Sequence, residues 1–290
     1  MPSVLLRERD GAMLTTPLLE QVEFQRPIRS PLRYPGGKSR AVKIIYDYIP
    51  KNVKKICSPF LGGGSLEIHC AQNGKIVYGY DSFKPLVDFW RCLLSNPEKL
   101  ARNVEKHYPV EKEEFYRLQT VQFDSKSQIE SATLFFVLNR TSFSGSTLSG
   151  GMATGGDEEN PNPRFTKSSI ERLREFRLDN LFVELADFKE SIPKHDDAFL
   201  YLDPPYMIDS KLYGRKGDLH RDFDHQGLAN ILKERNNWIL SYNNSEDIDK
   251  LYEGYVKRYP DWKYGMSNNK SSREVLIFSH DIAKLHNLDE

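Results

Sequence analysis

The chain has 290 residues, with 41 Lys or Arg against 41 Asp or Glu, so its formal net charge is zero. That balance excludes a broad polycationic surface, although a local basic patch still permits nucleic-acid binding. Hydrophobic residues at 39% and aromatic residues at 12% can fill a large core. No apolar run approaches the roughly 20 residues that a membrane span needs. We therefore expect one large domain, or one domain with a substantial insertion, and no membrane partner.

The metal-binding and disulfide signals are weak. Cys57, Cys70 and Cys92 form no CxxC pair, and the seven histidines show no zinc-ligand spacing. We expect no metal site, and we expect the three cysteines to be reduced core residues of a cytoplasmic protein.

The first half of the chain alternates strands and helices. After an irregular leader at 1–30, the pattern predicts a strand at 54–57, a helix at 65–73 and a strand at 75–80. Gly74 is a natural helix stop between the last two. A further amphipathic helix follows, with Leu and aromatic residues at helical spacing. Such a βαβα unit predicts a parallel sheet with right-handed crossovers.

The middle of the chain changes character before the alternation resumes. Residues 97–139 are expected to be helical, and 140–163 form a long glycine-rich connection, which is usually functional or mobile. Thr166 is a candidate cap for the next helix. Further strands are predicted at 181–185, 198–202, 238–242 and 274–278, with a helix at 225–235. We therefore divide the chain into a catalytic α/β domain (31–90 and 166–290) and an inserted module (91–165).

A glycine-rich turn follows the first predicted strand. It reads Ser58-Pro-Phe-Leu-Gly-Gly-Gly-Ser65, and glycines there let a ligand approach the backbone at a helix N-terminus. Asp81 ends the next strand, about 20 residues on, where an acidic residue can bind ribose hydroxyls. The turn is not GxGxxG, so by itself it indicates only weakly a nucleoside-containing cofactor. Asp81 could instead cap a helix.

Asp203, Pro204, Pro205 and Tyr206 follow the apolar strand 198–202. Asp203 can accept a hydrogen bond from an amine, the prolines offer carbonyls without competing N–H groups, and Tyr206 offers an exposed ring for stacking. The tetrapeptide suits chemistry on a planar ring that carries an amine. An ordinary strand-ending turn is the alternative.

Upstream, Gly37-Lys38-Ser39 looks like the end of a phosphate-binding P-loop. The spacing argues against a nucleotide triphosphatase, because the first glycine of that motif would fall at Leu32.

Taken together, the chain resembles a Dam-like (D12 class, alpha group) adenine-specific DNA methyltransferase. Four segments match in the family's order: Tyr34-Pro-Gly-Gly-Lys38, Pro59-Phe-Leu-Gly-Gly-Gly-Ser65, Asp81 and Asp203-Pro-Pro-Tyr206. Weaker matches are Asn139-Arg-Thr-Ser-Phe-Ser-Gly145, Ala186-Asp-Phe188 and Arg273-Glu-Val-Leu276. The resemblance implies a Rossmann-like fold of the S-adenosylmethionine-dependent methyltransferases. The inserted module would then be the DNA target-recognition region.

The resemblance also implies residue roles. Asp203, Pro204 and Tyr206 would be catalytic, and Arg140, Ser142 and Phe143 would contact DNA. S-adenosylmethionine would be bound by Tyr34, Gly36, Lys38, Phe60, Gly62, Gly64, Asp81, Asp187, Phe188 and Asp203. Asp187 could equally be a helix cap. Where the family often has an acidic residue before Pro-Phe, this chain has Ser58, which leaves the contact of that carboxylate open.

The implied activity is methyl transfer to the N6 amine of a flipped adenine in double-stranded DNA, at a specific sequence and without metal. Cytosine-N4 or RNA-base methylation, and a silent DNA-binding relative, are the alternatives. A restriction endonuclease acting separately is a possible partner, in the cytoplasm of a prokaryote or of a phage-infected cell.

Overall fold

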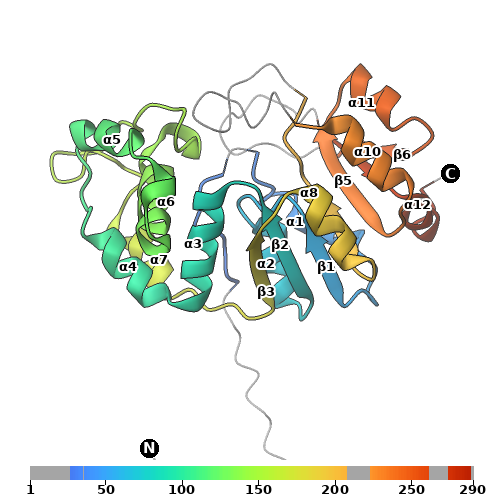
Figure 1. Cartoon of the computed structure of the whole chain (residues 1–290), viewed down its shortest axis with the longest axis horizontal. Helices are drawn as coiled ribbons and strands as arrows, with labels where there is room; N and C mark the ends of the chain where they lie inside the picture. The colour runs from blue at the N-terminus through green and yellow to red at the C-terminus, as the bar shows by residue number, and fades with distance from the viewer. Residues whose placement is uncertain (1–26, 35, 208–222, 261–273, 289–290) are drawn as a thin grey trace, which may run out of the picture.

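The computed structural model describes residues 27–34, 36–207, 223–260 and 274–288. The core is a seven-stranded sheet in the order β3-β2-β1-β4-β5-β7-β6 (Figure 1). The strands are β1 (Lys55–Ser58), β2 (Ile76–Asp81), β3 (Leu181–Leu185), β4 (Phe199–Leu202), β5 (Trp238–Asn243), β6 (Val256–Arg258) and β7 (Glu274–Phe278). The strands predicted from sequence are therefore present, and β6 is an addition. The leader predicted at 1–30 falls mostly outside the described residues.

The sheet is parallel except at β7. β1 pairs in parallel with β2 and with β4, whereas β7 runs antiparallel to both β5 and β6. Chain order thus reverses between β1 and β4, and in open α/β sheets ligands bind at the carboxyl ends of the strands at this switch point. This arrangement confirms the predicted α/β methyltransferase-like fold.

Side-chain alternation along the strands creates a core on each face of the sheet. In β4, Phe199 and Tyr201 join one buried cluster, and Leu200 and Leu202 join the other. Helices α1 (Val42–Asp47), α2 (Ser65–Gln72), α3 (Lys84–Ser95) and α12 (His280–Leu285) supply the first cluster. Helices α8 (Phe188–Ser191), α10 (His225–Lys233) and α11 (Glu246–Leu251) supply the second. The result is a three-layer sandwich.

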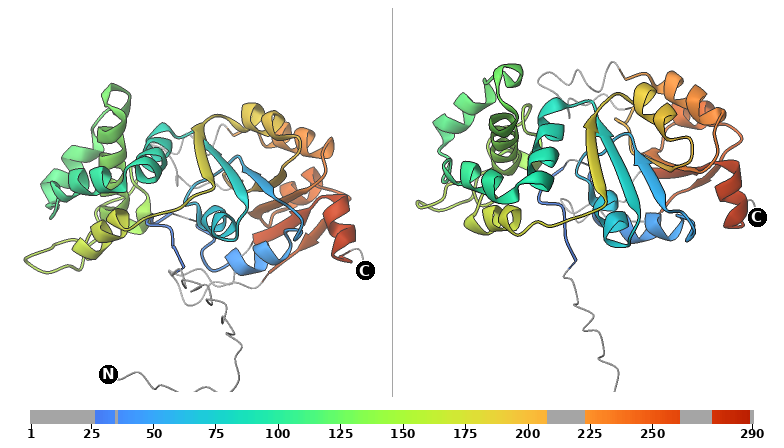
Figure 2. Two further views of the ribbon diagram at one scale, coloured as in Figure 1. Left: turned by 90° about the horizontal axis from the view of Figure 1, so that it is seen from below. Right: turned by 60° about the horizontal axis from the view of Figure 1, so that its bottom comes forward.

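The region predicted to be helical at 97–139 contains three α-helices with breaks between them. These are α4 (Pro97–Glu105), α5 (Lys112–Gln119) and α6 (Gln128–Thr141), followed after the glycine-rich connection by α7 (Lys167–Arg174). They lie to one side of the sheet, beyond α3 (Figures 1 and 2). Because α7 packs on α4, this group of helices extends past residue 165. Thr166 caps α7 as expected, accepting a hydrogen bond from the Ser169 amide.

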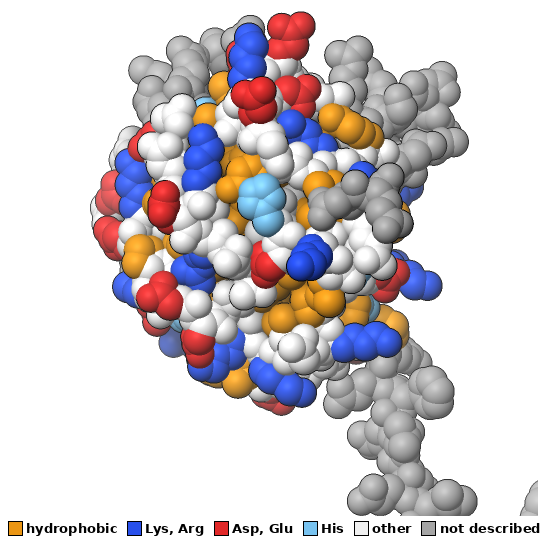
Figure 3. Space-filling model, turned by 90° about the vertical axis from the view of Figure 1, so that its right-hand side faces the viewer, with side chains coloured by type: hydrophobic (Ala, Val, Ile, Leu, Met, Phe, Trp, Pro, Cys, Tyr) orange, Lys and Arg blue, Asp and Glu red, His pale blue; other side chains and the backbone are white. Residues whose placement is uncertain are grey.

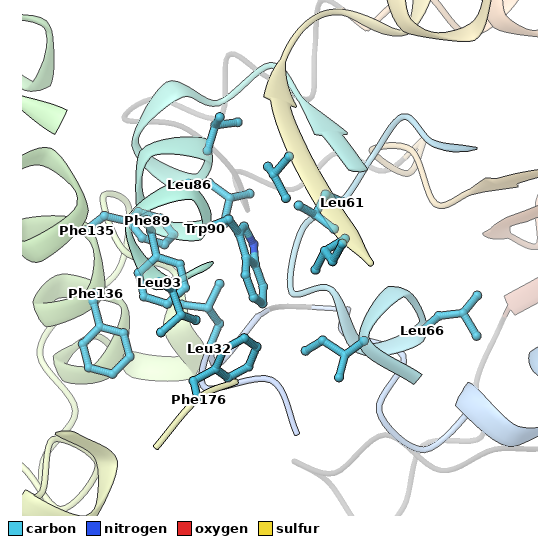
Figure 4. Close-up of a cluster of buried hydrophobic side chains, with 14 of the residues drawn as sticks. Leu32, Leu61, Leu66, Leu86, Phe89, Trp90, Leu93, Phe135, Phe136 and Phe176 are labelled. Atoms are coloured by element: carbon cyan, nitrogen blue, oxygen red, sulfur yellow. The ribbon is translucent and has the colours of Figure 1, made fainter. Parts of the chain in front are cut away.

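The inserted helices share one core with the sheet. On α3, Phe89 stacks on Phe136 of α6 at a ring distance of 5.5 Å, and Trp90 points from α3 toward the glycine turn (Figure 4). All three side chains are fully buried. Burial of such rings contributes on the order of 2–3 kcal/mol each, so α6 is fixed against α3.

The three cysteines are buried and free, as predicted. Within the described ranges, no helix combines the length and apolar character of a membrane span.

Candidate functional site

The glycine turn between β1 and α2 is packed against Tyr34. A Cβ atom at Gly62 would lie 2.9 Å from the Tyr34 ring, and one at Gly63 would lie 2.8 Å from Tyr34 Cβ. Gly64 has φ +64°, and a Cβ there would lie 2.9 Å from the Trp90 ring. The glycines were predicted to admit a ligand. The structure adds a second reason, since side chains at these positions would displace Tyr34 and Trp90.

Asp81 links the turn to the end of β2. Its carboxylate accepts hydrogen bonds from the amides of Gly62 at 3.1 Å and of Phe83 at 2.9 Å. Burial raises the pKa of Asp81 to about 6, against the effect of these hydrogen bonds. Asp81 does not cap α3, whose N-cap position is Phe83. It stands at the carboxyl end of the sheet with its oxygens directed at the turn.

The tetrapeptide after β4 meets Lys38. Lys38 Nζ lies 2.7 Å and 2.8 Å from the two carboxylate oxygens of Asp203, and 2.8 Å from the hydroxyl of Tyr206. It also donates to the Gly36 carbonyl at 3.2 Å. Sequence suggested an exposed Tyr206 ring. Instead, Tyr206 is half-buried, because its hydroxyl is held inside this cluster.

Glu274, the first residue of β7, completes the cluster. Its carboxylate lies 3.3 Å from Lys38 Nζ and accepts a hydrogen bond from the Tyr206 hydroxyl. Burial raises the pKa of both Asp203 and Glu274, and the nearby Lys38 ammonium opposes this rise. From the sequence, Glu274 belonged only to the weak match Arg273-Glu-Val-Leu276. Arg273 itself lies outside the described residues.

Three aromatic rings form another part of the cavity lining, here called the aromatic wall. Phe60 and Phe188 lie 5.9 Å apart, and Phe223 lies 5.5 Å and 5.3 Å from their respective ring centres. Phe223 was not predicted, since no motif surrounds it. Asp187 is exposed and caps α8, accepting from the Lys189 amide at 2.9 Å. Its alternative role as a helix cap is therefore confirmed.

These groups border a single cavity at the carboxyl ends of β1, β2 and β4. Every residue predicted to be catalytic or to bind the cofactor lines it: Tyr34, Gly36, Lys38, Phe60, Gly62, Gly64, Asp81, Asp187, Phe188, Asp203, Pro204 and Tyr206. The inserted module contributes the segment from Gly145 to Leu148 to the same wall. The cavity thus joins the two parts of the chain.

The three predicted DNA-contact residues have different surroundings. Arg140 donates to the Arg164 carbonyl at 2.6 Å and to the Pro31 carbonyl at 3.4 Å. Ser142 is buried, and its hydroxyl accepts a hydrogen bond from the Thr147 amide at 2.9 Å. Only Phe143 is well exposed, at 67%. Arg140 and Ser142 therefore hold the segment in place, and Phe143 projects from it.

The position of Ser58, left open by sequence, has a carboxylate beside it. Ser58 Oγ donates to Glu67 Oε1 at 2.6 Å, and both side chains are buried. Glu67 lies on α2 and lines the cavity. It went unnoticed in sequence because an acidic residue in the first turn of a helix is common.

The strand order with its reversed β7, the glycine turn and the Asp-Pro-Pro-Tyr cluster define a methyltransferase. Comparison with known proteins gives the family: the sequence pattern of the D12 class N6 adenine-specific DNA methyltransferases matches residues 34–266. The chain belongs to this family. It is a site-specific, adenine-specific DNA methyltransferase, as the motifs predicted.

Several type II methyltransferases are similar over most of their length. M1.LlaDCHI of Lactococcus lactis subsp. cremoris is 22% identical over 241 residues, covering 77% of this chain and 84% of its own. M.CviBI of Paramecium bursaria Chlorella virus NC1A is 23% identical, covering 80% and 90%. M.MjaIII of Methanocaldococcus jannaschii is 26% identical, covering 77% and 88%.

Proposed function

We propose that this enzyme transfers the methyl group of S-adenosylmethionine to the N6 amine of an adenine flipped out of double-stranded DNA. One observation carries the proposal. Asp203, Pro204 and Tyr206 border the same cavity as Asp81 and the glycine turn, so an amine-holding group and a nucleoside-binding group face one space.

The residues of the cavity fit the cofactor. The aromatic wall of Phe60, Phe188 and Phe223 suits a purine ring, with Asp187 at its edge. The Asp81 carboxylate suits ribose hydroxyls. Tyr34, Gly36, Lys38, Gly62, Gly64 and Asp203 would surround the methionine end. S-adenosylmethionine supplies a methyl group activated by its positively charged sulfur.

The protein's part of the chemistry is to reshape the target amine. The N6 lone pair of adenine is delocalised into the ring, which makes the amine a poor nucleophile. The Asp203 carboxylate and the Pro204 carbonyl can each accept one N6 proton, and this favours a tetrahedral nitrogen with a localised lone pair. Positioning of this kind contributes several kcal/mol to lowering a barrier. Asp203 must then accept a hydrogen bond from N6, although in the structure it accepts one from Lys38 Nζ at 2.7 Å.

The target base has to leave the helix to reach this cavity. Flipping the base costs a few kcal/mol of free energy, and stacking of the base on an aromatic side chain offsets about 1–3 kcal/mol of this cost. We assign that stacking to Tyr206, whose hydroxyl is fixed by Lys38 and Glu274. A ring held in one orientation loses little further entropy when the base arrives.

We propose that DNA approaches along the inserted module. Phe143 is exposed there. Burial lowers the pKa of Arg140, and the guanidinium groups of Arg172, Arg33 and Arg164 lower it further. By contrast, the face over the C-terminal elements mixes Lys and Arg with Asp and Glu (Figure 3). A cluster of arginine side chains suits phosphate binding better than this mixed face.

The relatives named as type II methyltransferases suggest a further element of the proposal. The methylation would protect host DNA from a separate restriction endonuclease that reads the same sequence. DNA from cells expressing the enzyme would then resist cleavage by that endonuclease, and DNA from cells with Asp203→Ala would not.

Mapping of modified bases in DNA from expressing cells tests the function. The expected result is N6-methyladenine confined to one short sequence, and absent with Asp203→Ala. Methylcytosine as the product, or methylated RNA with unmodified DNA, would contradict the proposal. So would protein that binds DNA without transferring a methyl group under any condition.

A further inference from the structure

Glu67 is a buried carboxylate that the mechanism above does not use. It is the third residue of α2 and is only 4% exposed. Its Oε1 accepts a hydrogen bond of 2.6 Å from Ser58 Oγ, and its side chain borders the cavity. None of the ion pairs formed among the described residues includes Glu67. A buried carboxylate without a cation is costly, by several kcal/mol, unless something else neutralises it.

The Lys38 ammonium, which acts electrostatically on Glu67, already contacts other carboxylates. Lys38 Nζ contacts both oxygens of Asp203 and lies 3.3 Å from Glu274. Lys38 and Asp203 both influence Glu67, in opposite directions: Asp203 raises its pKa and Lys38 lowers it. Lys38 is thus the ammonium partner of both Asp203 and Glu274, and Glu67, which lines the same cavity as Lys38 and Asp203, adds a further carboxylate.

Excess negative charge at one end of a cavity selects a cationic ligand group. The cofactor in the proposed function carries two cations, the methionine ammonium and the sulfonium. Of these, only the ammonium has N–H donors for a carboxylate oxygen, and hydrogen bonds with both partners charged are the stronger kind.

We propose that Glu67 binds the ammonium group at the methionine end of S-adenosylmethionine, an inference that rests on the proposed function. Ser58 is then a positioning residue, which orients the carboxylate by donating to Oε1. Position 58, where the family often has an acidic residue, carries Ser in this chain. The carboxylate comes instead from Glu67 on α2, which is hydrogen-bonded to Ser58 Oγ.

The alternative is that the Ser58–Glu67 hydrogen bond only ties α2 to β1. The two roles differ in their dependence on the ligand. A structural tie affects every ligand of the cavity alike, whereas an ammonium contact affects only ligands that carry the ammonium.

Calorimetric titration of the full chain with three ligands separates these roles. S-adenosylmethionine and S-adenosylhomocysteine carry the ammonium, whereas 5′-methylthioadenosine has the adenosine and no amino-acid part. For Glu67→Gln, which keeps the shape of the side chain, we expect the first two affinities to fall about tenfold or more. We expect the affinity for 5′-methylthioadenosine to stay within about twofold. Glu113→Gln, an exposed charge on α5, is the matched control with no expected change.

The outcomes are distinct. An equal loss for all three ligands in Glu67→Gln would assign Glu67 a structural role, and no loss for any would exclude the contact. A loss for S-adenosylmethionine alone would place the carboxylate at the sulfonium and overturn the assignment to the ammonium. If the unaltered enzyme bound none of the three, the proposed function would fail instead.

Discussion

Lys38 Nζ lies 2.7 Å and 2.8 Å from the two oxygens of Asp203. The carboxylate that is proposed to hold the target amine is therefore paired with an ammonium in the structure. The two residues are 165 positions apart in the sequence, one before α1 and one after β4. Lys38 is buried, and Asp203 keeps 22% of its side chain exposed. Lys38 therefore neutralises the charge of Asp203, while part of the Asp203 side chain stays exposed.

Replacing Lys38 by Met removes this neutralisation. Burial already raises the pKa of Asp203 and Glu274, and loss of the ammonium raises both further. The folded state then binds more protons than the unfolded state, so stability falls as pH rises above the ordinary carboxyl values. We expect Lys38→Met to cost about 3 kcal/mol at pH 8 and clearly less at pH 5.

Urea unfolding at both pH values measures this difference. Lys38→Met with Glu274→Gln should recover part of the loss at pH 8, because one buried carboxylate is gone. An equal loss at pH 5 and pH 8 would show that Lys38 acts through packing alone.

Glu67→Gln should stabilise the enzyme free of ligand at high pH. Burial raises the pKa of Glu67 from 4.5 to about 7, so the wild type loses stability as pH rises between these values. Gln does not ionise and can still accept from Ser58. We expect a gain of at most about 3 kcal/mol at pH 8 and almost none at pH 4.5.

Thermal unfolding across this pH range provides the measurement. A variant that is less stable than wild type at pH 8 would contradict a buried, charged Glu67 without a cationic partner in the free enzyme. Stabilisation combined with weaker cofactor binding is the expected signature of a site that sacrifices stability for function.

Gly145 should tolerate no side chain. It has φ +75°, and a Cβ atom would lie 1.8 Å from the Arg33 carbonyl oxygen. Gly145→Ala must therefore move the backbone of 145–148 or of Arg33, at a cost of about 3 kcal/mol. Gly155 is the matched control, since it has φ +97° with nothing within 4 Å of its Cβ position.

For Gly155→Ala we expect only the backbone cost of about 1 kcal/mol. Chemical denaturation of the two variants gives the comparison. Equal effects would mean that the close approach of Gly145 to Arg33 does not constrain the cavity wall.

Phe143→Ala should separate DNA binding from folding. The ring is 67% exposed, so its removal should change the free energy of unfolding by less than about 0.5 kcal/mol. If the ring stacks against DNA, KM for DNA should rise about tenfold, with cofactor affinity unchanged. Steady-state kinetics on a methylatable duplex test this, with Tyr116→Ala, another exposed ring on the inserted helices, as the control.

A variant with unchanged KM for DNA would remove Phe143 from the interface. The assignment of DNA to the inserted module would then depend on the arginine cluster alone.

Much of the fold was predictable because its signals are local. The strands at 181–185 and 274–278 have the predicted bounds, although only the second is buried throughout and the first has exposed residues between buried ones. β6 was missed because its three residues, Val256–Arg258, are only half-buried and carry no pattern. The 97–139 region was predicted to be helical, and the breaks between α4, α5 and α6 were not predicted.

The candidate site was predictable where residues fall within motifs. Lys38, Asp81 and Asp203 were found in this way. Glu274 and Glu67 were not, because their importance comes from partners distant in sequence or on another element. Glu274, on β7, contacts Lys38, which precedes α1. The Ser58–Glu67 hydrogen bond joins strand β1 to helix α2. No periodicity or spacing in the sequence reports such contacts.

The amine-holding role of Asp203 has the most direct test. Purified enzyme is incubated with S-adenosylmethionine labelled in the methyl group and with mixed-sequence duplex DNA, and the DNA is digested to nucleosides. The account predicts label in N6-methyldeoxyadenosine, and a rate at least about 100-fold lower for Asp203→Ala and Asp203→Asn, with binding of 5′-methylthioadenosine preserved. Label in another nucleoside, or full activity in either variant, would contradict it.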